Sequence, residues 1–247
     1  MKKKILNILN QYQNFNFIFN LFFIFSFFLL TGLSFIGYIN ENYSFIYICI
    51  FSLIFIINFW IICIVYSKKK SRNAVLELIS MRAMVKKFNN LNGAEIGVYR
   101  GSYSQQIIDY FKSKKILLNL HLIDPWEVDS EFTNYGSSDL EDAYMSVKSK
   151  FENKKNIKII KSTSINASTK YNDFFFDFVY IDGNHEYRHV KQDLDLWYPK
   201  LKNEGILFGD DYLRPYGVQK AVKEFAYEKK LIVHFTDNGN QFYFIKS

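Results

Sequence analysis

Two apolar runs that end in acidic residues constrain the fold of this chain more than any other feature. The first spans residues 175–182 and ends in Asp182, and the second spans residues 206–208 and leads into Asp210 and Asp211. A polar segment of helical character lies between them. Two buried strands joined by a helix are typical of a βαβ unit. Ligands of open α/β sheets bind at the carboxyl ends of such strands, so these acids mark a candidate site.

The remaining pattern predicts a doubly wound α/β domain with helices between its first five strands. A turn is expected at residues 203–205, just before the second apolar run. Residues 237–240 read Asp-Asn-Gly-Asn, which is a strong signal for a hairpin turn between the last two strands. Five further strands complete a predicted set of seven, at residues 94–98, 116–123, 157–161, 231–236 and 241–246.

The N-terminal part of the chain contains two long apolar segments without charge. Residues 17–39 and 45–66 are each longer than the ~20 residues that a helix needs to cross a bilayer. We therefore expect residues 1–70 to form a membrane anchor of two transmembrane helices, a helical hairpin. A linker helix over residues 71–90 and a domain over residues 91–247 are expected to follow. A cleaved signal peptide and a buried hairpin of a soluble protein are the alternatives.

The distribution of positive charge sets the expected orientation of this anchor. Lys2, Lys3 and Lys4 precede the first apolar segment, a second lysine run at residues 68–70 follows the next one, and no Lys or Arg lies between. The positive-inside rule then predicts a two-pass integral membrane protein whose termini and domain are cytoplasmic. Residues 1–70 also carry +5 of the net charge of +7. The basic balance therefore gives no reason to expect a nucleic-acid partner.

A loop with two glycines follows the first expected strand of the domain. Its pattern is Glu95, Gly97 and Gly101, and a helix begins near Ser102. Glycine lets a ligand approach the backbone, and a helix N-terminus favours polar or anionic groups. An acid in the first position would repel a pyrophosphate, so the pattern favours a cationic ligand or one with an amino-acid end. A plain strand-to-helix turn is the alternative.

An acid also ends the second expected strand, where Asp124 precedes Pro125 and Trp126. An acid at the end of strand two of a nucleotide-binding sheet usually receives ribose hydroxyls. An aspartate that caps the loop before the proline is the alternative. Asp124 is therefore a candidate ligand for a nucleoside.

These residues together resemble the class I S-adenosylmethionine-dependent methyltransferases, and among them the branch that contains macrocin O-methyltransferase and related sugar O-methyltransferases. The resemblance covers about residues 90–245 and leaves the predicted membrane hairpin outside it. It implies a Rossmann-like sheet of seven strands, mostly parallel, with an antiparallel last strand. Four motifs carry it in order, Glu95-Ile96-Gly97-Val98-Tyr99-Arg100-Gly101-Ser102, Ile123-Asp124-Pro125-Trp126, Asp182-Gly183-Asn184-His185 and Gly209-Asp210-Asp211-Tyr212.

The resemblance also implies where S-adenosylmethionine binds. Glu95, Gly97 and Gly101 are expected to line its methionine part, and Asp124 to bind its ribose. Ser162 corresponds to the serine that approaches adenine, although Lys161 stands where relatives often have a glycine. The full set of expected cofactor contacts is Glu95, Gly97, Gly101, Ser102, Asp124, Ser162 and Asp182.

A divalent metal, usually Mg²⁺, is implied at Asp182, Asp210 and Asp211. Acids at the tips of neighbouring strands, ~4.8 Å apart, can share one cation. Oxygen ligands favour magnesium over zinc. His185 is implied as the general base, because Asn184 stands where other relatives carry an acid. The expected catalytic residues are therefore His185 and Asp182.

The chemistry that this site predicts is methyl transfer to a hydroxyl. A sugar hydroxyl becomes a good nucleophile when a metal lowers its pKa and a base takes its proton. We expect an O-methyltransferase that acts on a sugar or glycan-like acceptor at the cytoplasmic face of the membrane, where the acceptor could be lipid-linked. The sequence leaves open whether the protein forms a homo-oligomer.

Two other functions compete with this prediction. His185-Glu186-Tyr187-Arg188-His189 fits the H-E-x-x-H pattern of zinc metalloproteases, here on a membrane anchor. The preceding Asp-Gly-Asn places His185 at or before a helix N-terminus, which argues against that pattern. The other alternative is a module that binds the cofactor without catalysis.

Overall fold

The computed structural model divides the chain into two units, Met1–Ser67 and Lys68–Ser247. It describes residues 50, 52–54, 56, 57, 59, 60, 73–88, 90–127, 136–213, 217–237 and 239–247. The eight described residues of the first unit are helical. The second unit contains the whole sheet.

The predicted localisation is contradicted. In the part of the chain that the structure describes, no helix has both the length and the apolar character needed to cross a membrane. The predicted spans, residues 17–39 and 45–66, lie outside the described residues apart from the eight helical ones between residues 50 and 60. A two-pass integral membrane protein with cytoplasmic termini is therefore not retained.

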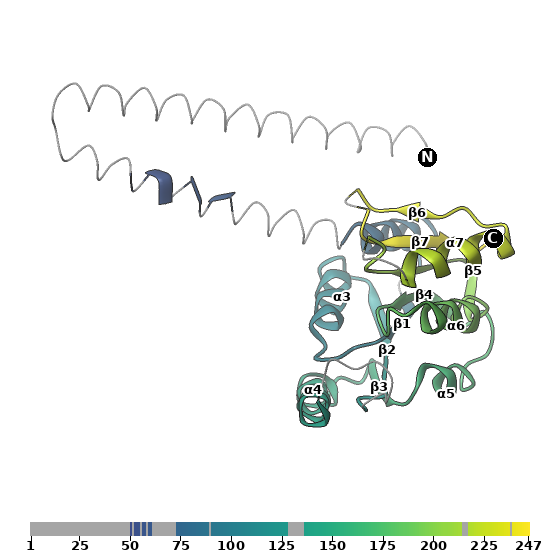
Figure 1. Ribbon diagram of the computed structural model, residues 1–247, viewed down its shortest axis with the longest axis horizontal. Coiled ribbons are helices and arrows are strands. Elements are labelled where there is room, and N and C mark those ends of the chain that lie inside the picture. Colours follow the sequence, from purple (N-terminus) through teal and green to yellow (C-terminus); the bar gives the residue numbers. More distant parts are fainter. Residues whose placement is uncertain are drawn as a thin grey trace, which may run out of the picture. The chain divides into compact units, whose positions relative to one another are not determined.

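The second unit is built on one seven-stranded sheet with the order β3-β2-β1-β4-β5-β7-β6. The first five strands pair in parallel, whereas β7 pairs antiparallel with both β5 and β6 (Figure 1). The predicted seven-stranded, mixed α/β fold is thus confirmed. The strands are β1 (Asn90–Ile96), β2 (Leu117–Asp124), β3 (Ile157–Lys161), β4 (Phe176–Ile181), β5 (Leu201–Gly209), β6 (His234–Phe235) and β7 (Phe242–Ile245).

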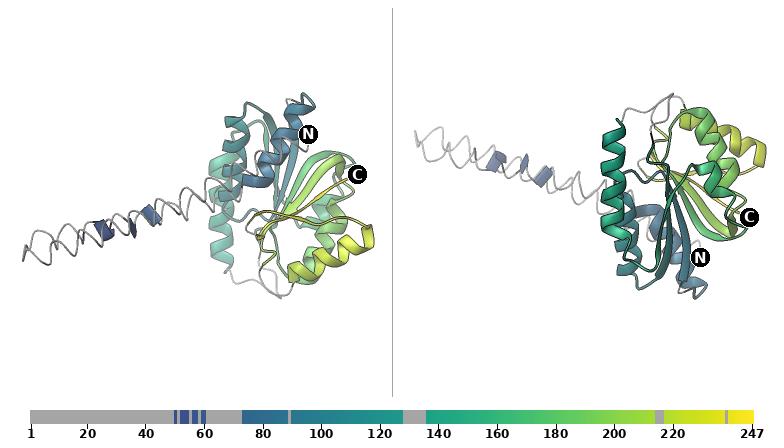
Figure 2. Two further views of the ribbon diagram at one scale, coloured as in Figure 1. Left: turned by 90° about the horizontal axis from the view of Figure 1, so that it is seen from above. Right: turned by 90° about the horizontal axis from the view of Figure 1, so that it is seen from below.

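Helices cover both faces of the sheet (Figure 2). The helix of residues 73–85 packs with α3 and α4 into one core cluster, and α5, α6 and α7 contribute to a second cluster on the other face. The labelled helices are α3 (Ser102–Ser113), α4 (Ser137–Phe151), α5 (Ser164–Ser168), α6 (Tyr187–Trp197) and α7 (Gly217–Lys229).

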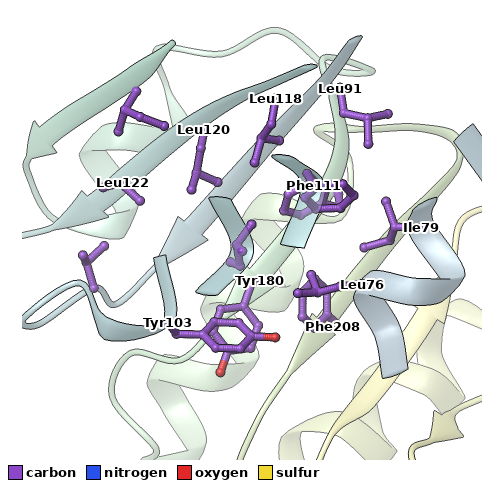
Figure 3. Packing of buried hydrophobic residues seen from close by; sticks show 14 of the residues in the cluster. Leu76, Ile79, Leu91, Tyr103, Phe111, Leu118, Leu120, Leu122, Tyr180 and Phe208 are labelled. Carbon is purple, nitrogen blue, oxygen red and sulfur yellow. The ribbon is translucent and has the colours of Figure 1, made fainter. Parts of the chain in front are cut away.

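The helix expected as a linker contributes to the core of the second unit. Val75, Leu76 and Ile79 are at most 4% exposed. Figure 3 shows Leu76 and Ile79 in one cluster with Phe111 of α3 and Phe208 of β5. Three large apolar side chains on one helical face therefore bind this helix to the sheet.

The turn predicted at residues 203–205 is wrong, because β5 runs through it. The pairing of β4 with β5 shifts register between Phe176 and Phe178. Glu204 has a φ of 63°, and a Cβ on Gly205 would lie 2.8 Å from the carbonyl oxygen of Lys202. Residues with turn character here form an irregularity within the strand, as at a β-bulge.

Candidate active site

The site residues predicted from sequence converge on the carboxyl edge of the sheet. Ile96 of β1 lies in register with Ile123 of β2 and with Ile181 of β4, and Ile181 is in register with Gly209 of β5. The residues that follow these four positions therefore leave the sheet side by side. They are Gly97, Asp124, Asp182 and Asp210.

The loop after β1 needs its two glycines. Gly97 has a φ of 85°, and a Cβ there would overlap the backbone of Asp182 on the neighbouring strand. Gly101 is the N-cap of α3 with a φ of 71°, and a Cβ there would lie 2.8 Å from the ring of Phe151. Glycine adopts positive φ without the steric penalty of other residues, so the loop can pass close to β4 and α4.

Asp124 organises this loop. Its Oδ2 accepts hydrogen bonds from the backbone N–H groups of Val98 at 2.8 Å and Tyr99 at 2.9 Å, and its Oδ1 accepts one from Trp126 at 2.7 Å. The backbone carbonyl of Asp124 accepts the N–H of Ser162, which brings the end of β3 beside it. A carboxylate has about four acceptor positions, so three amides leave capacity for a ribose hydroxyl. The ribose role stays a prediction.

Glu95 is buried beneath the loop and is 1% exposed. Burial raises the pKa of Glu95 well above its ordinary value, and the negative charges of Asp182 and Asp124 act in the same direction. Among the described residues, its Oε2 has no hydrogen-bond partner. A buried oxygen without a partner is costly unless a ligand supplies a donor, and the amino group of S-adenosylmethionine is such a donor. The residue thus fits its predicted role.

Three side chains gather at the ends of β4 and β5. Asp182, His185 and Asp211 each offer one ligand atom, and these atoms all lie within 4.8 Å of one another. His185 Nδ1 is 3.4 Å from Asp211 Oδ2, and its Nε2 is 3.9 Å from Asp182 Oδ1. Carboxylates suit Mg²⁺ and Mn²⁺, while an imidazole extends the choice to other transition metals. We call this set the acid–histidine cluster.

Asp210 was predicted as a metal ligand and lies beside the acid–histidine cluster rather than in it. It is 5% exposed, and its Oδ1 accepts the N–H of Asp211 at 2.9 Å together with the side-chain amide of Asn240. Asp211 has a φ of 58°, which is unusual for a residue other than glycine. Asp210 therefore helps hold Asp211 in a conformation that directs its carboxylate to His185. Ligation by Asp210 stays a prediction.

A comparison with known protein families identifies the class of the enzyme. Residues 94–212 match a protein family described as a methyltransferase domain. The chain is an S-adenosylmethionine-dependent methyltransferase. This confirms the predicted class of enzyme. No curated protein matches the sequence of this methyltransferase.

Two solved structures share the fold of the methyltransferase. The O-methyltransferase NovP is 16% identical over 70% of this chain and 79% of its own, with a TM-score of 0.55. A caffeoyl-CoA O-methyltransferase candidate from Staphylococcus aureus is 17% identical over 70% of this chain and 83% of its own, with a TM-score of 0.50. Similarity of this degree establishes the fold and leaves the acceptor to be argued from the site.

The H-E-x-x-H segment does not form a protease zinc site in the methyltransferase. Glu186 is the N-cap of α6, so His185 precedes the helix and His189 lies within it. A zincin needs both histidines on one face of one helix. In the described part of the chain, the acid–histidine cluster contains His185 with two aspartates and does not include His189.

A separate cavity of about 400 Å³ lies at the opposite, amino-terminal ends of the strands. Leu91 of β1, Asp177 of β4 and Ile206 of β5 line it together with Ile79 and Arg82 of the N-terminal helix. None of the predicted site residues lines this cavity. The predicted site residues lie instead at the carboxyl edge of the sheet.

Two residues beside the acid–histidine cluster were missed from the sequence. Asn240 lies in the turn between β6 and β7, and its amide reaches Asp210. Tyr180 precedes Asp182 by two residues, and its hydroxyl donates a hydrogen bond to the Asp182 carboxylate. Period-two spacing along β4 could have placed Tyr180 on the face of Asp182, whereas no local signal pairs Asn240 with β5.

Proposed function

We propose that this methyltransferase is a divalent-metal-assisted O-methyltransferase whose acceptor is a hydroxyl of a sugar or glycan-like molecule. The observation that carries the proposal is the acid–histidine cluster, Asp182, His185 and Asp211, beside the glycine loop that ends at Gly101. The names of the two similar structures, both of which describe O-methyltransferases, support oxygen as the methyl acceptor. The sugar class rests on the resemblance of the four sequence motifs.

The cofactor-binding half of the site is assigned to the end of β1 and to the loops after β1, β2 and β3. Glu95 accepts the amino group of S-adenosylmethionine, and Asp124 accepts its ribose. Gly97 and Gly101 allow close approach of its methionine part. Ser102 at the start of α3 and Ser162 at the end of β3 complete the contacts.

The other half of the site prepares the acceptor. Asp182 and Asp211 would hold the cation, which when bound would lower the pKa of the acceptor hydroxyl. His185 takes the hydroxyl proton as general base. The acceptor oxygen then forms a bond to the methyl carbon, and the carbon–sulfur bond breaks with its electron pair left on sulfur. The products are the methyl ether and the thioether form of the cofactor.

The test is transfer of labelled methyl from S-adenosylmethionine to a panel of nucleotide-activated sugars and a catechol, with Mg²⁺ or with EDTA. We expect label on a sugar hydroxyl, lost with EDTA and reduced at least about 100-fold in Asp211→Asn. Asp195→Asn is the matched control, because Asp195 forms a surface ion pair with Lys191 on α6. Transfer that survives both EDTA and Asp211→Asn would exclude the metal, and label on the catechol alone would exclude the sugar.

A further inference from the structure

Tyr180 has a buried hydroxyl at a position where the aromatic ring alone would satisfy the packing. It is 1% exposed on β4 and belongs to the same core cluster as Phe178 and Phe208. Its ring centroid lies 4.5 Å from that of Tyr103 on α3 and 4.8 Å from that of Phe208 (Figure 3). Phenylalanine would fill this position equally well, so packing alone does not explain the hydroxyl.

The hydroxyl of Tyr180 points to the acid–histidine cluster. It donates a hydrogen bond of 2.9 Å to Oδ2 of Asp182, which lies two residues further along the chain on the same face of the sheet. Oδ1 of that carboxylate lies on the side of His185 Nε2, at 3.9 Å. The bond therefore fixes the rotation of the Asp182 carboxylate and presents its other oxygen to the centre of the cluster.

The hydrogen bond from Tyr180 of β4 to Asp182 has a counterpart at the end of β5. The carboxylate of Asp210 accepts a hydrogen bond from the backbone N–H of Asp211. The side-chain amide of Asn240 donates a second hydrogen bond to the same carboxylate. Each acid of the cluster thus has a buried polar neighbour that sets its direction. The ring of Tyr180 packs against Tyr103 and Phe208, and this packing holds its hydroxyl in place.

We propose that Tyr180 is a positioning residue that orients Asp182 for cation binding through its hydroxyl. This inference rests on the proposed function of the cluster as a cation site. Hydrogen-bond partners of metal ligands set ligand direction, and their loss typically costs 10–100-fold in metal affinity or activity. Tyr180→Phe removes this one oxygen and keeps the aromatic packing.

The experiment is a titration of the full-length protein with Mn²⁺, followed by electron paramagnetic resonance, for wild type and the variants Tyr180→Phe, Tyr171→Phe and Asp182→Asn. We expect Tyr180→Phe to weaken Mn²⁺ binding about tenfold. It should lower kcat for methyl transfer and leave KM for S-adenosylmethionine unchanged. Tyr171→Phe is the matched control, because Tyr171 is 8% exposed in the other core cluster and its hydroxyl lies 2.7 Å from His121 Nδ1. It should bind Mn²⁺ like wild type.

Three results would overturn the inference in distinguishable ways. Wild-type affinity in a folded Tyr180→Phe protein would show that the hydroxyl does not orient Asp182. Equal weakening in Tyr180→Phe and Tyr171→Phe would show a general loss of stability. Absence of Mn²⁺ binding in wild type, or binding unchanged in Asp182→Asn, would remove the cation site of the proposed function and the inference with it.

Discussion

At the scale of single residues, His185 is the group whose role separates binding from chemistry. It lies between the carboxylates of Asp182 and Asp211, where it could serve as a base or as a ligand. If His185 is the general base, we expect His185→Gln to lower kcat on the order of 100-fold with little change in Mn²⁺ affinity. His189→Gln is the control and should leave kcat unchanged. If His185→Gln instead abolished Mn²⁺ binding, the residue would be a ligand.

Asp193 on α6 provides a prediction about stability and pH. It is 6% exposed, and burial raises the pKa of Asp193 from 3.8 to about 7, although the hydroxyl of Ser164 bonds its carboxylate. The raised pKa means that the stability contributed by neutral Asp193 is fully present below pH 3.8 and is lost as pH rises through 7. We expect wild type to lose on the order of 2–4 kcal/mol from this group by pH 8.

The measurement is urea unfolding of wild type and Asp193→Asn at pH 5 and pH 8. The asparagine keeps an oxygen that can accept from Ser164 and never becomes charged. It should therefore raise the free energy of unfolding at pH 8 more than at pH 5. An identical pH dependence in both proteins would contradict the assigned pKa of Asp193.

The conformation of the glycine loop after β1 was predictable from sequence because its constraints are local. Gly97 and Gly101 both have positive φ, and Asp124 ends its strand as expected. The sequence also named Asp182, His185 and Asp211 as site residues, but it did not distinguish Asp211 from Asp210. Asp210 and Asp211 are adjacent in sequence, and only the backbone turn between them, with a φ of 58° at Asp211, decides which carboxylate reaches His185.

At the scale of elements, the helix of residues 73–85 is the clearest test of what the domain needs to fold. Complete burial of Val75, Leu76 and Ile79 corresponds to roughly 4.5–9 kcal/mol at 1.5–3 kcal/mol per side chain. This is comparable to the whole stability of a typical domain. We expect a chain that begins at residue 68 to unfold in one cooperative transition, and a chain that begins at residue 91 to lack one.

Circular dichroism during thermal unfolding of the two truncated chains checks this prediction. A sharp transition in the chain that begins at residue 91 would show that the helix is dispensable and acts only as a connection. The sequence indicated the helix from its apolar spacing. Its packing partners, Phe111 and Phe208, are far away in sequence and could not be read from that spacing.

The strands show the same division between local and distant information. Periodicity and turn residues located β3 at residues 157–161 without error. They failed at β5, where Asn203, Glu204 and Gly205 have turn character but lie within a strand that begins at Leu201. The register with β4 resumes only at Ile206, so it is the hydrogen bonds linking Glu204 and Gly205 to Lys246 that override the local preference.

At the scale of the whole molecule, one edge of one sheet carries both halves of the proposed reaction. The end of β1 and the loops after β1, β2 and β3 hold the groups assigned to the cofactor, and the loops after β4 and β5 hold the acid–histidine cluster. This division predicts that cofactor binding and cation binding can be damaged separately. The two halves meet where Gly97 passes the backbone of Asp182.

The central claim is most directly tested by calorimetric titration of the full-length protein with S-adenosylmethionine. We expect one-to-one binding in wild type and in Asp211→Asn, and no binding in Gly97→Ala, whose Cβ would overlap the backbone of Asp182. Gly136→Ala is the matched control, since the nearest atom to its Cβ is 4.0 Å away, and it should bind like wild type. Absence of binding in a folded wild-type protein, or undiminished binding in Gly97→Ala, would contradict the account.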